Sequence, residues 1–399
     1  MKLANKYTCT GCMACVDSCA KGAISCILGN DGHYYPVLDS KACIQCGLCQ
    51  KVCPVLSKLD YKGTGKTISF AAWNTDDEQI MKSASGGIFS ALATAVINKG
   101  GYVVGVSMEE SQSFHKIISC KEEIIQLQGS KYQQSLTSGI YTQTARLLKE
   151  GKLVLFQGTG CQVAGLYGYL RGKTYENLIT VDLICGGVPS RLLIDKFNEL
   201  TPGAKILSYR DKQQGWCDSY HLTIEQNGEK KRDSQYSQII KDGYACKHAL
   251  RYSCYNCAFV GVDRKTDFTI ADFWGDKDHL DKKHTGVSYV AVHTEKGMNL
   301  MQQCNIEYHR TEVEKVIVKN PRLICGKTPL YSLGFGRRFI GWNFIHLSYS
   351  GLLSVYAGKY RGVKYLIIKI YNYLLWRASK YIQRKEVNKL VRIYNESIH

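Results

Sequence analysis

The chain has 399 residues, of which 45% are hydrophobic and 22% charged, and its formal net charge is +18. This length predicts two or three domains, and the balance of apolar and charged residues excludes a wholly disordered chain. No stretch reaches the ~18 consecutive apolar residues of a membrane-spanning helix, and the first residues lack the apolar core of a secretory signal. The 18 cysteines are therefore expected in a reducing, cytoplasmic compartment, where clustered cysteines more often bind metals than form disulfides.

Two cysteine runs at the N-terminus share the spacing C-x2-C-x2-C-x3-C. Their members are, in chain order, Cys9, Cys12, Cys15 and Cys19, then Cys43, Cys46, Cys49 and Cys53, with Pro54 after the second run. This is the spacing of bacterial two-cluster ferredoxins, in which the fourth cysteine of each run ligates the other cluster. Ala20 replaces the proline expected after the first run, which removes no ligand.

The ferredoxin spacing predicts two 4Fe–4S clusters and the ligands of each. One cluster is expected on Cys9, Cys12, Cys15 and Cys53, and the other on Cys43, Cys46, Cys49 and Cys19. Zinc is the main alternative, but zinc sites use paired C-x2-C knuckles rather than two runs of this form.

Residues 56–67 are predicted to form a polar linker, after which the pattern changes to alternating strands and helices. The sequence predicts a helix over 83–98 and strands at 68–73, 101–106, 152–158 and 177–185. Residues 205–234 alternate like an antiparallel hairpin that turns at Asn227-Gly228. Together these elements predict a mixed sheet flanked by helices.

The stretch SASGGIFSAL (83–92) places serines and glycines directly before an apolar helix. Free N–H groups and the positive end of the helix dipole would suit a phosphate or a flavin oxygen. The alternative is an ordinary helix start with tight packing. No G-x-G-x-x-G follows a strand, so a Rossmann cofactor site is not predicted.

Four further cysteines occupy strand ends or loops and could hold another cluster or zinc. Cys161 and Cys185 follow predicted strands, and Cys254 and Cys257 form a C-x2-C pair. A buried small apolar residue is the alternative for any one of them, and this alternative is weakest for the pair. The remaining cysteines lack such partners and are expected to be structural: Cys26, Cys120, Cys217, Cys246, Cys304 and Cys325.

Six motifs, in this order, resemble those of the coenzyme F420 hydrogenase/dehydrogenase β-subunit family: SASGGIFSAL, GSKYQQS, GTGCQVAGL, DLICGGVPS, RYSCYNCAF and DFTIADFWGD. The first 60 residues resemble a bacterial ferredoxin domain fused to that subunit. The resemblance implies an α+β or α/β protein, and the chain as a whole divides into four parts. Three of these are a two-cluster ferredoxin domain (1–60), a flavin-side segment (68–160) and an intrinsic-cluster segment (161–335). The fourth, a basic amphipathic helical tail (337–399), is predicted from composition and not from the resemblance.

The resemblance implies an iron–sulfur flavoprotein, an FAD-dependent oxidoreductase that moves electrons between clusters, flavin and an organic substrate. Relatives act on F420 or on chlorophyll-type substrates, and bacterial members with a fused ferredoxin domain commonly accompany polysaccharide-synthesis genes. The alternative is a non-catalytic subunit that delivers electrons to a partner enzyme.

The resemblance also implies which residues act. A third 4Fe–4S cluster is expected on Cys161, Cys185, Cys254 and Cys257. The implied cofactor-binding residues are Ser85, Gly86, Gly87, Ser130, Lys131, Tyr132, Thr159 and Gln162. Lys131 is the candidate for stabilising a reduced flavin, with a solvated surface lysine as the alternative. Asp272 is the candidate proton donor, with a loop-fixing role as the alternative. Gly160 and Gly186 depart from the family pattern beside the expected flavin.

The last sixth of the chain carries most of the positive charge, with twelve Lys or Arg and two Asp or Glu from residue 337 to 399. Aromatic and aliphatic residues interleave with basic ones there, as in a helix that lies on an anionic membrane surface. The alternative is a terminal helix packed on the body with a solvated basic face. Nucleic acid is not an expected partner, since no recognition motif accompanies the charge. The expected partners are an electron-donor or electron-acceptor protein and an organic small molecule.

Overall fold

The computed structural model describes residues 1–233 and 250–324. The predicted basic tail (337–399) lies outside these residues, as do Cys246, Cys325 and the end of the segment predicted to reach residue 335. In the described part of the chain, no helix has the length and apolarity needed to cross a bilayer.

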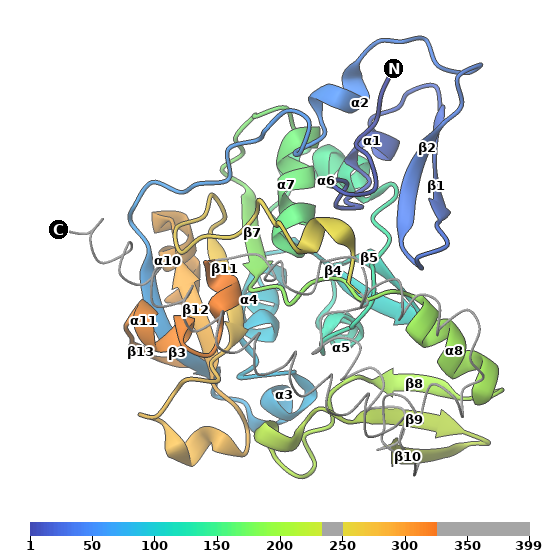
Figure 1. The fold of residues 1–399 in the computed structure, drawn as a ribbon. Helices are drawn as coiled ribbons and strands as arrows, with labels where there is room; N and C mark the ends of the chain where they lie inside the picture. The colour runs from blue at the N-terminus through green and yellow to red at the C-terminus, as the bar shows by residue number, and fades with distance from the viewer. Residues whose placement is uncertain (234–249, 325–399) are drawn as a thin grey trace.

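An eight-stranded mixed sheet forms the body, in the order β13-β3-β12-β11-β7-β6-β4-β5 (Figure 1). β4, β6, β7 and β11 run parallel to one another, and the other neighbours pair antiparallel. The strands are β3 (Ile68–Asn74), β4 (Tyr102–Glu109), β5 (Gln112–Ile118), β6 (Val154–Gln157), β7 (Leu178–Leu183), β11 (Phe268–Asp272), β12 (Ser288–Val292) and β13 (Ile306–Arg310). The predicted mixed α/β sheet is confirmed.

Helices cover both faces of this sheet. They are α3 (Asp77–Lys82), α4 (Ile88–Ile97), α5 (Ile124–Leu127), α6 (Ile140–Lys149), α7 (Gly160–Tyr169), α10 (Glu295–Met301) and α11 (Val313–Ile317). Val103 and Leu155 enter the core on the side of α4 and α10, whereas the next residues, Val104 and Phe156, enter the core on the side of α6 and α7. Successive strand residues point to opposite faces, so strands buried on both faces have apolar residues at consecutive positions.

The helix predicted over 83–98 begins later, because α4 starts at Ile88. Gly87 has a φ of +77°, and the main-chain N–H of Asn74 donates to the carbonyl oxygen of Gly86 at 2.7 Å. A side chain at Gly86 would meet the carbonyl oxygen of Ala72 on β3. The SASGG residues therefore form a loop held against the sheet instead of a first helical turn.

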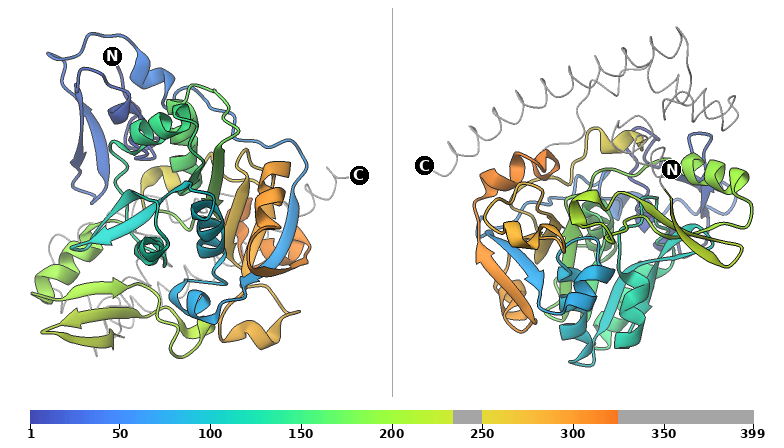
Figure 2. Two further views of the ribbon diagram at one scale, coloured as in Figure 1. Left: turned by 180° about the vertical axis from the view of Figure 1, so that it is seen from behind. Right: turned by 90° about the horizontal axis from the view of Figure 1, so that it is seen from below.

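A smaller three-stranded sheet packs with α8 (Leu192–Leu200) beside the body (Figure 2). Its strands are β8 (Lys205–Ser208), β9 (Leu222–Gln226) and β10 (Glu229–Asp233). Asn227 and Gly228 join β9 and β10 with φ values of +55° and +79°. The predicted hairpin and its turn are thus confirmed, since a two-residue turn with both φ values positive matches strand twist.

The N-terminal domain contains α1 (Ala14–Asp17), α2 (Leu48–Lys51) and the hairpin of β1 (Ile24–Leu28) and β2 (Tyr34–Leu38). It lies against α6 and α7 (Figure 1). Gly168 of α7 makes room for the domain, because a Cβ atom there would overlap the carbonyl oxygen of Val52. The Asp17 carboxylate accepts hydrogen bonds from the main-chain N–H groups of Gly139 (2.6 Å) and Tyr141 (3.0 Å). The domain therefore supplies the cap for the first turn of α6.

Candidate functional site

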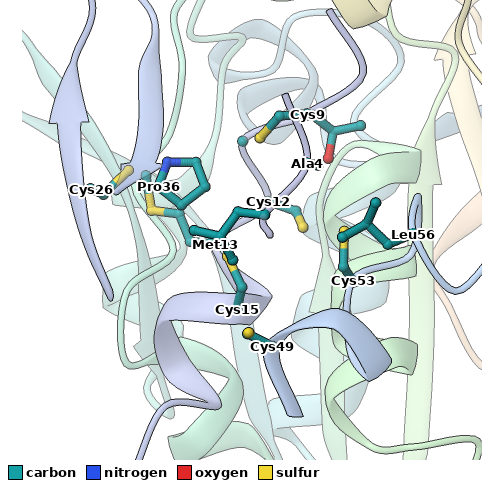
Figure 3. Close-up of a pocket in the computed structure, with 13 residues that line it drawn as sticks. Ala4, Cys9, Cys12, Met13, Cys15, Cys26, Pro36, Cys49, Cys53 and Leu56 are labelled. Atoms are coloured by element: carbon teal, nitrogen blue, oxygen red, sulfur yellow. The ribbon is translucent and has the colours of Figure 1, made fainter. Parts of the chain in front are cut away.

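The first predicted set of ligands gathers around one small cavity of about 20 Å³ (Figure 3). This first cysteine set consists of Cys9, Cys12, Cys15 and Cys53. Gly11 and Met13 turn the chain between the thiols with φ values of +72° and +62°. Burial, and then the neighbouring thiolates of Cys53 and Cys9, raise the pKa of Cys12 to about 12. The structure thus brings the fourth thiol of one run to the first three of the other.

Two other thiols line the same cavity. One is Cys49, which belongs to the second predicted set. The other is Cys26 on β1, for which the sequence offered no partner. Burial, and then the nearby Cys9 thiolate, raise the pKa of Cys26 to about 11. Cys26 is therefore a neighbour of the first cysteine set.

The second cysteine set lies closer to the surface. Its members are Cys19, Cys43, Cys46 and Cys49. Burial, together with the thiolates of its three partners, raises the pKa of Cys49, so the four thiols are neighbours. Cys46 is exposed, and the Cys43 sulfur accepts a hydrogen bond from the main-chain N–H of Gln45 at 3.4 Å.

The third predicted set comes from separate parts of the chain and lines a cavity of about 30 Å³. This third cysteine set consists of Cys161 at the start of α7, Cys185 after β7, Cys254 in the 3-10 turn η3 (Tyr252–Cys254), and Cys257 in the following loop. β6 and β7 are adjacent parallel strands, so the residues that follow them emerge at the same edge of the sheet. Sheet topology therefore brings Cys161 and Cys185 together.

Hydrogen-bond donors of the protein reach the sulfurs of this third set. The main-chain N–H of Gly187 donates to the Cys185 sulfur at 3.3 Å, and that of Val188 donates to the Cys254 sulfur at 3.4 Å. The Thr159 hydroxyl lies 3.2 Å from the Cys161 sulfur. Donors of this kind stabilise thiolates and tune the potential of iron–sulfur clusters.

The chemistry of these thiols favours metal ligation. Burial, and then the nearby Cys185 thiolate, raise the pKa of Cys254 to about 11. Such a thiol stays protonated at neutral pH until a cation takes the place of its proton. No three His, Cys, Asp or Glu side chains of residues 1–233 and 250–324 converge as the ligands of a single ion do. Four thiols, as in each of the three cysteine sets, are instead the donor set of a 4Fe–4S cluster.

A much larger cavity of about 280 Å³ adjoins the third cysteine set. The residues that start α4 and α7 both line it, so it is bordered by main-chain N–H groups with no partner inside their helices. The predicted cofactor-binding residues that line this large cavity are Ser85, Gly87, Ser130, Lys131, Tyr132, Thr159 and Gln162. Gly86 lies behind them and donates from its N–H to Ser288 Oγ at 3.0 Å.

Two of the predicted contacts are already engaged within the protein. Gln162 Oε1 accepts hydrogen bonds from the N–H and the hydroxyl of Thr159, both at 2.9 Å, and so closes the first turn of α7. Ser85 Oγ donates to the carbonyl oxygen of Val287 at 2.9 Å. The groups best suited to hold an anion here are therefore the main-chain N–H groups of the two helix starts.

Lys131 lies in the wall of the large cavity. Its ammonium donates to the carbonyl oxygens of Gln128 (2.7 Å) and Gln126 (3.3 Å). Burial lowers the pKa of Lys131 to about 7. Near neutral pH this side chain therefore changes between a charged and an uncharged form.

Asp272 also lines the large cavity, but both of its oxygens are occupied. Oδ2 accepts from Arg210 Nη1 at 2.8 Å, and Oδ1 accepts from the Trp216 indole at 3.0 Å. The buried Arg210 guanidinium lies 4.7 Å from the centre of the Tyr220 ring and 5.2 Å from that of Trp274. This geometry gives Asp272 an anchoring role, and its predicted proton donation stays a prediction.

The three cavities meet at one residue. Thr10 lines the cavity of the first cysteine set, that of the third set, and the large cavity. Cys161 and Cys185 line both the third-set cavity and the large cavity. The N-terminal domain and the body therefore share walls at the point where all three spaces adjoin.

Sequence reasoning missed several polar residues of this region. The Lys212 ammonium donates to the carbonyl oxygens of Ile80 (2.8 Å), Ser85 (2.6 Å) and Thr285 (2.6 Å), and so holds the SASGG loop in place. Arg251 was missed although it lies within the cysteine-pair motif RYSCYNCAF. The presence of a basic residue inside a cysteine-pair motif is the signal that could have identified Arg251.

Three family models match consecutive parts of the chain. Residues 8–56 match a 4Fe-4S dicluster domain. Residues 69–141 match the N-terminal part, and residues 151–317 the C terminus, of the coenzyme F420 hydrogenase/dehydrogenase beta subunit. These two β-subunit matches together span more than half of the chain.

The chain was also compared with curated proteins and with solved structures. No curated protein matches the sequence. Among solved structures, a chain of the xenon-derivatised F420-reducing NiFe hydrogenase complex from Methanosarcina barkeri is similar, with 16% sequence identity and a TM-score of 0.43. The likeness covers 76% of this chain and 94% of that one.

Proposed function

The chain belongs to the coenzyme F420 hydrogenase/dehydrogenase β-subunit family, and from that membership we propose that it is a three-cluster iron–sulfur flavoprotein oxidoreductase. Each cysteine set would hold one 4Fe–4S cluster, and the large cavity would hold FAD. Clusters of this kind carry single electrons, and a bound flavin joins them to two-electron chemistry on an organic substrate.

One observation carries this proposal. Cys161 and Cys185 are walls of the third-set cavity and of the large cavity alike, and Thr10 adds the first cysteine set to the same junction. Electron transfer needs its centres close together in a protein matrix, and shared walls supply that closeness. A chain whose cysteines were only structural would have no need of this arrangement.

The chain's own residues have separate tasks in this proposal. The starts of α4 and α7 offer N–H groups and positive dipole ends to the phosphates of the cofactor. Lys131 provides a charge or a proton at the cavity wall near neutral pH. Arg210 holds Asp272, another residue of the cavity wall, in place through a hydrogen bond.

The substrate, the location and the tail belong to the same proposal. The substrate would be an organic small molecule of a polysaccharide pathway, and the chain would work in the cytoplasm. The basic tail would contact an anionic membrane surface. Flotation with anionic and with neutral vesicles tests the contact, and recovery outside the lipid fraction in both would reject it.

An electron-transfer subunit without a substrate of its own is the second candidate. Cys46 and the neighbouring Ile44 are exposed, so a protein partner can reach the second cysteine set. The two candidates differ in one test. An enzyme, once reduced, is reoxidised by its small-molecule substrate alone, whereas a delivery subunit needs the partner protein.

Anaerobic purification with iron, sulfide and flavin quantitation tests the cofactor content. We expect about twelve irons and about one FAD per chain, from three cubane clusters. The double variant Cys254→Ala/Cys257→Ala should retain only about eight irons. About eight irons in the natural chain would reject the third cluster, and a preparation without flavin would reject the flavoprotein.

A further inference from the structure

A buried arginine from the body contacts the first cysteine set. Arg251 has no exposed surface, and it lies three residues before Cys254 of the third set. Its Nη2 donates to the Cys9 sulfur at 3.4 Å, and its Nε donates to the Cys9 carbonyl oxygen at 2.7 Å. One side chain of the body thus holds both the thiol and the backbone of a predicted ligand in another domain.

The rest of the guanidinium is held equally firmly. Nη1 donates to the carbonyl oxygen of Tyr34 at 2.9 Å and to Gln134 Oε1 at 3.2 Å. The Tyr35 ring centre lies 4.3 Å from Cζ, a distance typical of a cation–π contact. Gly11 is also packed against this group, since a Cβ there would collide with Gln134 and Arg251. Arg251 therefore has a single well-defined position.

The charge of Arg251 lacks an anionic partner within the described residues. All four of its hydrogen-bond acceptors are neutral groups or the thiol of Cys9, and none of the ion pairs among residues 1–233 and 250–324 includes Arg251. Burying a positive charge costs several kcal/mol unless an anion compensates it. A 4Fe–4S cluster on four thiolates carries a net charge of about −2. Such a cluster on the first cysteine set would be the missing anion.

We propose that Arg251 sets the reduction potential of the first cluster above that of the second, so that an electron shared by the ferredoxin domain resides next to the body. This inference rests on the proposed function, because it requires a cluster on the first cysteine set. Reduction adds one negative charge to a cluster. A fixed positive charge and an N–H donor at one of the sulfurs therefore stabilise the reduced form more than the oxidised form.

The second cysteine set lacks this feature. Its sulfurs accept hydrogen bonds from the main-chain N–H groups of Gln45 and Gln50 but from no charged side chain of the described residues, and Cys46 is exposed. Two runs of identical spacing thus meet unequal surroundings. The body supplies Arg251 and hence the difference between the two sets, so this difference exists only while the ferredoxin domain is docked on the body.

The test is a redox titration of the cluster-loaded chain, followed by electron paramagnetic resonance. Arg251→Gln removes the charge. In this variant the equilibrium constant for electron transfer to one cluster from the others should fall at least about tenfold, which corresponds to a reduction potential lower by about 59 mV for a one-electron couple. The other cluster steps should stay in place. Arg251→Lys keeps the charge but loses the planar fork, and it should shift the same step in the same direction by less.

A matched control is Arg322→Gln, because Arg322 Nε donates to the Cys185 carbonyl oxygen at 3.1 Å beside the third cysteine set. This variant should leave the step that Arg251→Gln moves unchanged. If Arg251→Gln binds less iron than the natural chain, the redox titration of Arg251→Lys is used as the test in its place. Unchanged or raised potentials in whichever variant is fully loaded, or an equal shift of every step, would overturn the proposal. Loss of clusters from the natural chain would instead reject the proposed function.

Discussion

The first and third cysteine sets each consist of four thiols, but the chain brings the four together in opposite ways. Three members of the first set lie within the seven residues Cys9–Cys15, and local left-handed turns orient them. The third set is assembled from the ends of two strands and a distant loop, up to 96 positions apart. The first set therefore depends on its loop, whereas the third depends on the whole sheet.

Stability should follow the same division. The body has its own cores on both faces of the sheet, and these cores include no ligand of any cysteine set. The N-terminal domain contributes only Cys12, Ala14 and Val52 to the buried part of a core that it shares with α6 and α7. Small domains with little core usually need a metal or a disulfide. Cluster loss should thus unfold one region and spare the other.

The largest expected effect comes from removing ligands. Cys12→Ala/Cys53→Ala should lose about eight of about twelve irons, because Cys19 of the disrupted run also serves the second cluster. Hydrogen exchange of residues 9–53 should then approach that of an unfolded chain, with the sheet still protected. Cys254→Ala/Cys257→Ala should lose about four irons and leave exchange in both regions close to that of the natural chain. Loss of protection in β6 or β7 of this second variant would contradict the comparison.

Gly168→Ala sharpens the comparison by separating the two regions with every ligand in place. The added methyl group would overlap the Val52 carbonyl oxygen, and overpacking of this kind costs about 1–3 kcal/mol. We expect protease cleavage in the 56–67 linker to rise about 5- to 140-fold, with iron content unchanged. Gln143→Ala on the exposed side of α6 is the control. Equal cleavage of both variants would show that α7 does not hold the domain.

The sequence predicted what depends on local spacing. The two ferredoxin runs, the mixed sheet and the turn at Asn227-Gly228 all follow from short patterns, and the structure agrees with the predicted fold. The third set could also be predicted, because the ends of neighbouring strands converge in a parallel sheet. Its role as a cluster site stays a prediction.

The rest depends on tertiary contacts that no short pattern encodes. A charged residue in a sequence is expected at the surface, so the burial of Arg210, Lys212 and Arg251 could not be predicted. The loop before α4 was predicted to be part of the helix because it directly precedes an apolar helical stretch, yet the contact of Gly86 with β3 prevents a helical turn there. The neighbourhood of Cys26 and Cys9 likewise arises from the β1–β2 hairpin folding over the cluster loop.

Lys212→Met tests the loop that borders the large cavity on the side of the body. Burial, and then the nearby Arg210 charge, lower the pKa of Lys212 from 10.5 to about 7. The folded state therefore disfavours the charged form of Lys212. Above pH 10.5 the side chain is neutral in both states, so the free energy of unfolding carries no penalty from its charge. The free energy of unfolding then decreases as the pH falls from 10.5 to about 7. The melting temperature of the natural chain should exceed that of the variant by more at pH 9 than at about pH 7. The exposed Lys149→Met is the control, and a difference that does not change with pH would contradict the assignment.

The smallest expected effect is at the cap that the N-terminal domain supplies to α6. Asp17→Ala removes the acceptor for the N–H groups of Gly139 and Tyr141, which costs about 1 kcal/mol at a helix start. Asp17→Asn keeps one carbonyl acceptor but loses the charge that the helix dipole favours, so its cost should be about half as large. Hydrogen exchange of the first amides of α6 should be faster in Asp17→Asn than in the natural chain and fastest in Asp17→Ala, with all clusters bound. Asp39→Ala, at an exposed carboxylate of the same domain, is the control. If Asp17→Ala matched that control, the cap would contribute nothing to docking, which would then rest on packing against α7 and on the other hydrogen bonds between the two regions, such as that of Arg251 with Cys9.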